Sequence, residues 1–349
     1  MKFKFLFGSL IIFIFSFGQE KHNYKVAVVA FYNCENFYDT IHNALVKDDE
    51  FTPTGEKNYT GKVYMDKVSK IATVLSTIGT DDNLKTIDGP AIIGLAEIEN
   101  DTVLNDLVHN SKLQKRNYQV VHYDSKDERG VDVALLYNPR YFIVEDSKPL
   151  FVTLPGHSKE AHYTRDILWV KGKLDGETVH IYVNHWPSRL GGEEASAPAR
   201  AAAALVCKHH IDSIALADGE QKVIIMGDLN DDPVSPSVTK VLQAKGDKKD
   251  IKPGCIYNPW IDLYKKGFGT LAYQDAWGLF DQIMVTYPWM SKDQDGFFFQ
   301  QAMIFNREFL RENIGKYKGY PMRTYDGNVY RGGYSDHFPT YIVLLKKIN

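Results

Sequence analysis

Short apolar runs alternate with stretches of helical periodicity along this chain, and polar residues follow many of the runs. The pattern predicts strands at 26–32, 91–96, 118–122, 131–137, 143–154, 167–170, 179–183, 223–226, 280–285 and 341–345. It predicts helices at 62–78, 196–217 and 237–244. Many strands with interspersed helices predict an α+β or mixed α/β fold, in which two stacked sheets carry helices on their outer faces.

Polar side chains that could bind a metal ion or act in catalysis follow several of the apolar runs. Glu97 closes the run 91–96, where its carboxylate either suits a hard divalent cation or faces solvent. Asp228 and Asn230 follow the run 223–226, and in an extended chain they point to the same side. They could together hold a metal ion, a water molecule or a phosphate oxygen, although Asp and Asn also favour simple turns.

Two histidines extend this pattern. His185 follows the run 179–183, and Arg189 comes soon after it in the next loop. An imidazole can protonate a leaving oxygen, and a guanidinium binds phosphate through parallel N–H groups. A lone histidine is more often a structural residue. His185 and Arg189 therefore indicate phosphate-ester chemistry only together with the other polar clusters. Asp336 and His337 stand side by side ahead of the last apolar run.

Composition narrows the function only partly. The 349 residues are 44% hydrophobic and 24% charged, with 21 Tyr, 19 Phe and 5 Trp, which indicates a large packed core and excludes a disordered chain. The net charge of −3 argues against a dedicated duplex-DNA binder, although a nuclease with a local basic patch stays possible. Three cysteines (Cys34, Cys207 and Cys255) form no disulfide framework or zinc motif.

The N-terminus has the features of a secretory signal. Lys2 and Lys4 precede an apolar run at 5–17, and small residues surround position 18. The run is short for a membrane span. We therefore expect a signal peptide at 1–18, a single domain at 19–349, and a secreted or periplasmic protein; the alternative is an uncleaved anchor.

The polar clusters, in this order, resemble the endonuclease/exonuclease/phosphatase superfamily, whose fold is that of deoxyribonuclease I. The matching segments are Asn33 to Asn36, Gly94 to Glu97, Asn184-His185, Gly227 to Asn230, Phe280 to Ile283 and Ser335 to His337. The resemblance covers 25–345 and implies a four-layer sandwich of two mixed β-sheets flanked by helices. It also implies Mg²⁺, with Mn²⁺ as an alternative, bound by Glu97 with Asn33 and Asp336 completing or bordering the site.

The same resemblance implies roles for the other site residues. Asp228 would orient or deprotonate the attacking water, and Asn230 would bind the scissile phosphate. His185 and His337 would be the catalytic imidazoles, one of them oriented by Asp281, while the choice of base stays open. Apart from the resemblance, Arg189, Arg165 and Tyr325 are expected to contact substrate, with Arg323 beside Tyr325 in a substrate wall. A structural role is the alternative for Arg165, Tyr325 and Arg323. Asp132 is considered as a carboxylate that orients the other imidazole. Hydrolysis with inversion at phosphorus and no covalent intermediate follows, because a metal ion and cationic donors suffice to neutralise the developing charge.

We therefore predict a secreted, Mg²⁺-dependent phosphoesterase, with nucleic acid as the first substrate hypothesis. A phosphatase or lipid phosphodiesterase is the alternative, although only Phe297, Phe298 and Phe299 offer an aromatic membrane contact. A non-catalytic binding module is disfavoured, because a degenerate site would lack at least one of these residues. We expect a monomer that does not stay inserted in a membrane after signal cleavage.

Overall fold

The computed structural model describes residues 23–80, 84, 86–155, 162–292 and 295–348. The predicted signal peptide at 1–18 lies outside these residues, and its cleavage and the export of the protein stay predictions. Within the described ranges, no helix has both the length and the apolar character that a membrane crossing requires.

The first sheet has six strands in the order β16-β19-β1-β2-β4-β3. These are β1 (Asn23–Phe37), β2 (Ile92–Ile98), β3 (Gln119–His122), β4 (Asp132–Tyr137), β16 (Phe298–Ile304) and β19 (Thr340–Ile348). β1 and β2 are parallel, and every other pair in this sheet is antiparallel. The carboxyl ends of β1 and β2 therefore reach the same edge of the sheet.

The second sheet has seven strands in the order β11-β12-β15-β10-β9-β8-β5. These are β5 (Phe142–Leu150), β8 (Ile167–Leu174), β9 (Glu177–His185), β10 (Lys222–Asp228), β11 (Ala244–Lys245), β12 (Ile256–Tyr257) and β15 (Asp281–Thr286). β9 and β10 are parallel, while β15 is antiparallel to β10. The end of β10 consequently lies between the end of β9 and the beginning of β15.

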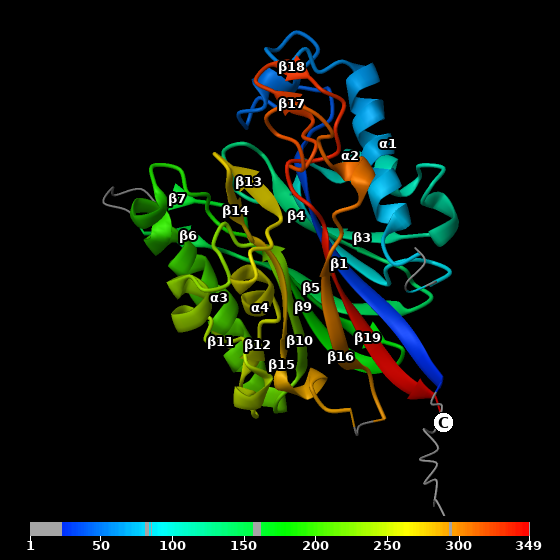
Figure 1. Cartoon of the computed structure of the whole chain (residues 1–349), viewed down its shortest axis with the longest axis vertical. Coiled ribbons are helices and arrows are strands. Elements are labelled where there is room, and N and C mark those ends of the chain that lie inside the picture. Colours follow the sequence, from blue (N-terminus) through cyan, green and yellow to red (C-terminus); the bar gives the residue numbers. More distant parts are fainter. Residues whose placement is uncertain (1–22, 81–83, 85, 156–161, 293–294, 349) are drawn as a thin grey trace, which may run out of the picture.

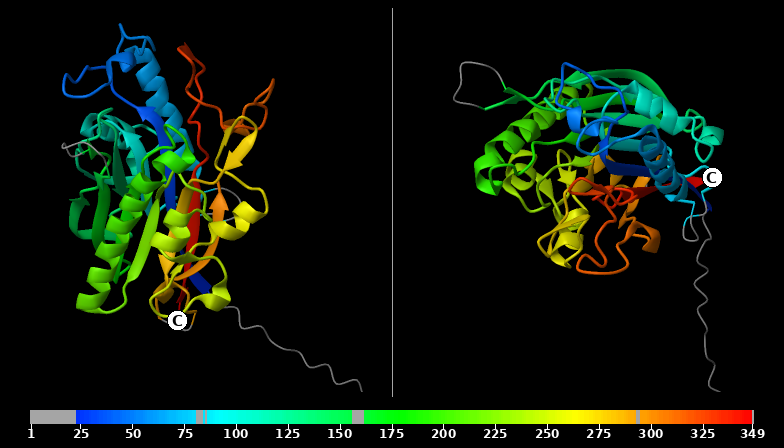
Figure 2. Two further views of the ribbon diagram at one scale, coloured as in Figure 1. Left: turned by 90° about the vertical axis from the view of Figure 1, so that its left-hand side faces the viewer. Right: turned by 90° about the horizontal axis from the view of Figure 1, so that it is seen from above.

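Helices cover the outer faces of both sheets. In Figure 1, α1 (Gly61–Thr77) and α2 (Asp101–Val108) lie on one side of the molecule, and α3 (Glu193–Asp218) and α4 (Trp260–Lys265) on the other. The view from above in Figure 2 shows the strands between these two groups. Three small hairpins complete the fold: β6 (Thr153–Leu154) with β7 (His162–Tyr163), β13 (Leu271–Tyr273) with β14 (Ala276–Gly278), and β17 (Tyr325–Asp326) with β18 (Val329–Tyr330).

Single helical turns lie in the connections. Five are 3₁₀ turns, at Asp49–Phe51, Gln114–Arg116, Lys248–Asp250, Tyr287–Trp289 and Glu308–Leu310, and one is a π turn at Ser237–Val241. The π turn replaces most of the helix expected at 237–244, and the strand expected at 143–154 is divided into β5 and β6. Sequence reasoning missed α2, α4 and β16, because these elements are short or carry irregular polar patterns.

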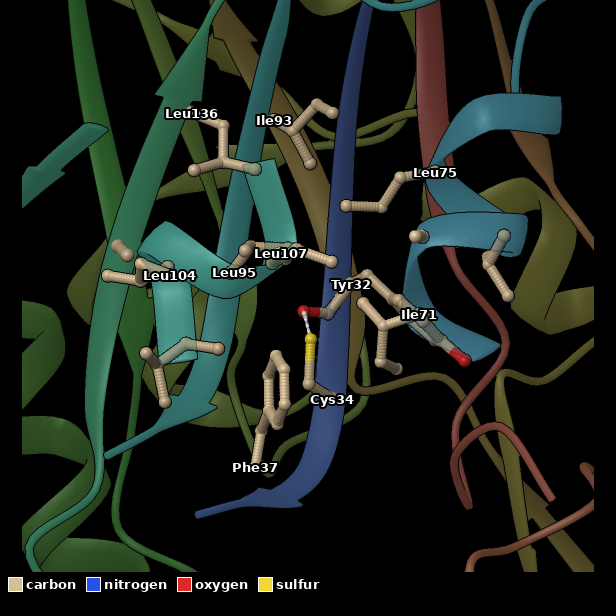
Figure 3. Packing of buried hydrophobic residues seen from close by; sticks show 14 of the residues in the cluster. Tyr32, Cys34, Phe37, Ile71, Leu75, Ile93, Leu95, Leu104, Leu107 and Leu136 are labelled. Carbon is tan, nitrogen blue, oxygen red and sulfur yellow. Dashed lines mark hydrogen bonds between the residues drawn. The ribbon is translucent and has the colours of Figure 1, made fainter. Parts of the chain in front are cut away.

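Side chains of β1 alternate between its two faces and so belong to two different layers of the core. Val28, Ala30 and Tyr32 face α1 and α2, whereas Val29 and Phe31 face the second sheet. This follows from the two-residue period of a strand, which sends neighbouring side chains to opposite faces. Figure 3 shows the outer layer, where Ile71 and Leu75 of α1 and Leu107 of α2 pack against β1.

Two further layers complete the core. Apolar side chains of both sheets meet between them, and Ala203, Ala204 and Cys207 of α3 cover the outer face of the second sheet. The arrangement is the predicted four-layer sandwich, and that prediction is confirmed. Phe297, Phe298 and Phe299 are each at most 4% exposed, so the aromatic segment considered for membrane contact packs against the protein itself.

All three cysteines, Cys34, Cys207 and Cys255, are buried and free, as expected of a fold held by its core. Cys34 lies in the layer under α1, and its thiol is directed to the Tyr32 carbonyl (Figure 3). The pKa of this thiol is raised to about 12, chiefly by burial. A buried thiol in this state is a packing residue and no nucleophile.

Gly94 marks the closest approach of the two sheets. A Cβ atom built on Gly94 would lie 2.4 Å from Met226 Sδ and 3.1 Å from Val183 Cγ1, on two strands of the opposite sheet. A side chain here would therefore push the sheets apart or displace Met226.

We expect Gly94→Val to destabilise the protein by about 3 kcal/mol, because an overpacked core forces strained rotamers and backbone shifts. Urea denaturation of the variant and of wild type measures the difference. Gly61→Val is the matched control, since a Cβ atom at Gly61 meets nothing within 4 Å. Equal loss of stability in both variants would show that space between the sheets is not the cause.

Candidate active site

The strand ends of both sheets meet at one edge of the sandwich and bring the predicted residues together. Asn33 and Glu97 stand at the ends of the parallel strands β1 and β2, and His185 and Asp228 at the ends of β9 and β10. Asp281 begins β15 and pairs directly with Asp228. Parallel strands deliver their carboxyl ends to one edge, and an antiparallel neighbour delivers its amino end there.

Glu97 occupies an unusual backbone conformation. Its φ is +60°, and the ladder between β2 and β4 shifts register around it. Bulges of this kind re-aim side chains, and positive φ in a residue other than glycine is costly and tends to occur at functional sites. The Asn36 amide, itself at φ +51°, donates to Glu97 Oε2 at 2.7 Å. The strained backbone thus fixes the direction of this carboxylate.

Asp228 lies at the centre of the site and is 2% exposed. Asn33 Nδ2 donates to Asp228 Oδ2 at 2.9 Å, and the Asn230 amide donates to Oδ1 at 2.9 Å. His185 Nε2 and His337 Nε2 lie 3.8 Å and 3.9 Å from Oδ2. Burial raises the pKa of Asp228 to about 6, although the charge of His337 acts in the opposite direction.

The glycine before Asp228 is required by close packing. A Cβ atom on Gly227 would lie 2.3 Å from the Asn184 carbonyl oxygen of β9. Only glycine lets β9 and β10 approach so closely at their ends, which explains the first position of the Gly-Asp-Leu-Asn segment.

His337 has a carboxylate partner on its far nitrogen. Its Nδ1 lies 2.7 Å from Asp281 Oδ2, and both residues are buried. Burial opposes the charged ring, but Asp281 and Asp228 raise the pKa of His337 well above its usual value. Ser335 Oγ accepts from the His337 amide and donates to the Asn33 carbonyl at 2.7 Å, which ties this segment to β1.

His185 is in the opposite electrostatic state. Its Nδ1 is buried and has no hydrogen-bond partner among the residues that the structure describes, and its Nε2 lies 3.8 Å from Glu97 Oε1. Burial and the nearby cations Arg165 and Arg129 lower the pKa of His185 well below its usual value. The site therefore contains one neutral and one protonated imidazole, both directed at Asp228.

The donor set fits a hard divalent cation. Glu97 Oε1 has no donor closer than Asn33 Nδ2 at 3.4 Å, and Asp336 Oδ1 is 3.9 Å from His337 Nε2, so each carboxylate keeps one oxygen available. Such oxygens are the ligands that Mg²⁺ and Mn²⁺ prefer. Ligand atoms of Asp228, Asp281 and His337 also lie within 4.8 Å of one another, so these three residues form a second group that could hold a metal ion.

Three residues expected to contact substrate have partners inside the protein. Arg165 donates to Asp127 Oδ2 at 3.0 Å and to the Trp186 carbonyl at 2.7 Å. Arg189 donates to the Asn230 carbonyl and to the carboxylates of Glu193 and Asp232. The Tyr325 hydroxyl donates to the Lys57 carbonyl. These contacts account for the position of each residue without a substrate.

Asn230 also has an internal contact. Its side-chain Nδ2 donates to the Trp186 carbonyl at 2.9 Å, while its φ of +48° turns the chain away from β10. The Trp186 carbonyl thus accepts from both Arg165 and Asn230. These two bonds fix the loop that follows His185 against the centre of the site.

Two cations near the site were not identified from the sequence. Arg129 Nη2 lies 4.0 Å from Glu97 Oε1, and Arg323 Nη2 donates to Asp336 Oδ2 at 3.0 Å. Their side chains are 42% and 50% exposed, so both can reach a bound anion. The sequence predicts Arg323 only as part of a substrate wall and does not single out Arg129.

The loop that carries Asp336 is anchored by a buried lysine. Lys67 of α1 is 1% exposed and donates to the Thr324 hydroxyl and to the Tyr334 carbonyl. A lysine on a helix is usually exposed to solvent, so this role could not be predicted from the sequence. Asp132, considered as an orienting carboxylate for an imidazole, instead lies 3.5 Å from His122 Nε2.

We expect Arg165→Met to reduce the free energy of unfolding by about 3 kcal/mol, because it removes the buried cation that binds Asp127 Oδ2 and the Trp186 carbonyl. Urea denaturation measures this loss. Arg140→Met removes an exposed guanidinium paired with Asp88 and should change stability little. A wild-type midpoint in Arg165→Met would contradict the structural role.

Asp166 predicts a pH dependence of stability. It is 8% exposed, its Oδ2 lacks a partner, and burial raises the pKa of its carboxyl group to about 6. The folded protein keeps this proton where the unfolded chain has lost it. The contribution of the Asp166 carboxyl group to the free energy of unfolding is therefore present at low pH and is lost as the pH rises through about 6.

We expect Asp166→Asn to lessen the loss of stability between pH 4.5 and pH 7.5 by about 1.5 kcal/mol, because the amide cannot ionise. Thermal or urea unfolding at both pH values measures the effect. The exposed Asp146→Asn should leave the pH profile as in wild type, and an identical profile for Asp166→Asn would sink the assignment.

Comparison with known proteins agrees with the arrangement of these strands. The profile described as Endonuclease/Exonuclease/phosphatase family matches residues 28–346. An endonuclease/exonuclease/phosphatase family protein from Bacteroides thetaiotaomicron has 15% identity and a TM-score of 0.55, with 94% of this chain and 100% of that chain covered. No curated protein matches the sequence.

Two other solved structures carry more specific names. A humanized D. rerio TDP2 has 13% identity and a TM-score of 0.53, covering 91% of this chain and 98% of its own. A mannosyl-6-phosphatase from Bacteroides thetaiotaomicron has 17% identity and a TM-score of 0.52, covering 91% and 99%. Identities this low show the fold alone. The profile match over 28–346, with the fold and the converging strand ends, establishes that this chain belongs to the endonuclease/exonuclease/phosphatase family.

Proposed function

We propose that the protein hydrolyses phosphate esters by direct attack of water, with a divalent cation bound at Glu97. The observation that carries this proposal is the fixed group of Asp281, His337 and Asp228 beside the Glu97 carboxylate. Such an ion, held by Glu97 with Asn33 or Asp336 at its border, supplies positive charge against the negative charge of the phosphate. Mg²⁺ is the expected ion, and Mn²⁺ is the alternative.

The two imidazoles have different parts in this proposal. The Asp281 carboxylate holds His337 Nδ1, so His337 Nε2 faces the reacting group as a positively charged proton donor. It stabilises charge on the phosphate or protonates the leaving oxygen. His185 has no carboxylate on Nδ1 and stays neutral, which suits a hydrogen-bonding contact better than an acid.

Asp228 is the proposed acceptor of the water proton. Its Oδ2 lies next to both imidazoles and to the Asn33 amide, and its Oδ1 is held by the Asn230 amide. A carboxylate so fixed can orient one water molecule toward phosphorus. No cysteine or serine nucleophile is required, so hydrolysis in one step with inversion at phosphorus is expected.

The cations near the site favour a substrate with a single phosphate group. Arg165 and Arg189 are engaged internally, which leaves Arg129 and Arg323 as half-exposed cations beside Glu97 and Asp336. Two guanidinium groups suffice for one phosphate, whereas a nucleic-acid strand is usually followed by a series of cations. Nucleic acid, the first hypothesis from the sequence, is therefore the second candidate substrate.

We expect purified protein to hydrolyse p-nitrophenyl phosphate or bis-p-nitrophenyl phosphate with Mg²⁺ or Mn²⁺ and to lose this activity in EDTA. Glu97→Ala and His337→Ala should each lower the rate at least about a hundredfold, because each removes charge stabilisation or proton transfer. Initial rates measured by absorbance test this.

Glu145→Ala and His209→Ala are matched controls, since both residues are exposed and lie away from the site. Wild-type rates in the Glu97 and His337 variants would overturn the proposal. A panel of hexose phosphates, inositol phosphates, plasmid, single-stranded DNA, RNA and sphingomyelin separates the substrate classes. Cleavage of plasmid or RNA in preference to the small esters would favour nucleic acid instead.

A further inference from the structure

A hollow of about 210 Å³ opens beside the candidate active site, and we call it the Lys57 hollow. Its walls come from the end of β1, the turn at Asp49–Phe51, Lys57, and the β17–β18 hairpin. In Figure 1 this hairpin lies next to the segment that follows β1, at the same end of the molecule as the strand ends. The volume is below the range of drug-sized sites and suits one small ring.

Two residues join the Lys57 hollow to the residues proposed to hold the metal ion. Asn36, on its wall, donates its backbone amide to Glu97 Oε2 at 2.7 Å. Arg323, on the same wall, donates to Asp336 Oδ2 at 3.0 Å. A phosphate placed beside Glu97 and Asp336 would therefore project its remaining substituent toward this hollow.

The charged side chains around the Lys57 hollow form two pairs, each of one cation and one carboxyl group. Lys57 Nζ lies 3.4 Å from Glu50 Oε2, and Arg323 Nε lies 3.6 Å from Glu35 Oε1. Each of the two cations therefore already has a carboxyl group beside it. The Asn36 side chain, by contrast, makes no hydrogen bond within the described part of the chain. Hydroxyl groups, which both donate and accept, are the natural partners of such a mixed wall.

The aromatic rings of the wall are not available for base stacking. Phe51 is 7% exposed and stacks on Tyr38, with ring centroids 4.4 Å apart. Tyr325 is also 7% exposed, packs edge-on to Tyr330, and lies under the Lys57 ammonium at 5.6 Å. A nucleobase binds single-strand sites mainly through an open aromatic face, which this hollow does not offer.

Lys57 is held in place before any ligand binds. Its side chain is 16% exposed, and its Nζ donates to the Gly327 carbonyl at 2.9 Å and to Asn328 Oδ1 at 3.1 Å. A preorganised donor of this kind loses little side-chain entropy on binding. A larger hollow of about 710 Å³ lies near Lys248 and Lys265, but none of the candidate active-site residues lines it.

We propose that the Lys57 hollow binds the hydroxyl-bearing ring of a phosphorylated sugar whose phosphate lies beside Glu97 and Asp336. The inference rests on the proposed function and names its substrate class. Glu50, Lys57 and Asn36 bind ring hydroxyls, while Arg323 lies between the ring and the phosphate. The ring is neutral, so its binding energy comes from paired hydrogen bonds and not from net charge.

The test measures binding apart from hydrolysis. Isothermal titration in Mg²⁺ compares a hexose 6-phosphonate, whose phosphorus–carbon bond water does not cleave, with propylphosphonate and a nucleoside 5′-phosphonate. We expect the hexose compound to bind at least about tenfold more tightly than either of the others. Glu50→Gln and Lys57→Met should each reduce this preference at least about tenfold, because each removes a charged hydrogen-bonding group.

Glu145→Gln and Lys62→Met are the matched controls on exposed positions, and thermal melting establishes that every variant is folded. Equal affinity for the hexose and propyl compounds, tighter binding of the nucleoside compound, or an unchanged preference in both variants would each overturn the inference. If the hexose compound is preferred but no metal-dependent hydrolysis is found, the proposed function fails and the sugar site stands. If metal-dependent hydrolysis is found but the hexose compound is not preferred, the proposed function stands and the sugar site fails.

Discussion

The hydrogen bond from Asn33 to Asp228 joins the two sheets at the edge where the candidate site lies. Asn33 lies near the carboxyl end of β1 in the first sheet, where its pairing with β2 shifts register, and Asp228 ends β10 in the second sheet. Asn33 Nδ2 donates to Asp228 Oδ2 at 2.9 Å. The bond is possible because the sheets approach closely, with glycine at position 94 facing Met226. Glu97, His185 and Asp281 are then placed by their strands, and Asp336 and His337 by the loop that precedes β19.

Burial makes this junction electrostatically demanding. Asp228 and Asp281 are both almost fully buried, and two neighbouring carboxylates in a low-dielectric interior repel one another. A protonated His337 between them offsets this repulsion, which is why its pKa is raised while that of His185 is lowered. The opposed pKa shifts of the two imidazoles follow from their surroundings: Asp281 and Asp228 raise the pKa of His337, whereas burial, Arg165 and Arg129 lower that of His185.

Charged side chains inside the protein hold the loops around the site. Arg165 binds the loop after His185, Arg189 binds the loop after Asp228, and Lys67 binds the segment before Ser335. Each charge meets carboxylate or carbonyl oxygens, as a buried charge must. These contacts hold the loops in place, and Lys67 also binds the hydroxyl of Thr324, which lines the Lys57 hollow.

Much of the site could be predicted from the sequence, because it lies at strand ends. Apolar runs that end in Glu97, His185 and Asp228 mark both the strands and the residues they deliver, and the two-residue period sets which faces are buried. The family, the fold class and the positions of these residues follow from that local information.

Only the tertiary structure decided how the charged groups are shared. The sequence predicts Arg165 and Arg189 as phosphate ligands and does not single out Arg129, because their partners lie 38, 41 and 32 positions away along the chain. Long-range pairing commits the first two to the scaffold and leaves the third beside Glu97. The sequence thus determined which residues reach the site. The tertiary structure decided which of their charged groups can contact a substrate, because a guanidinium bound to a buried partner inside the protein is not available to one.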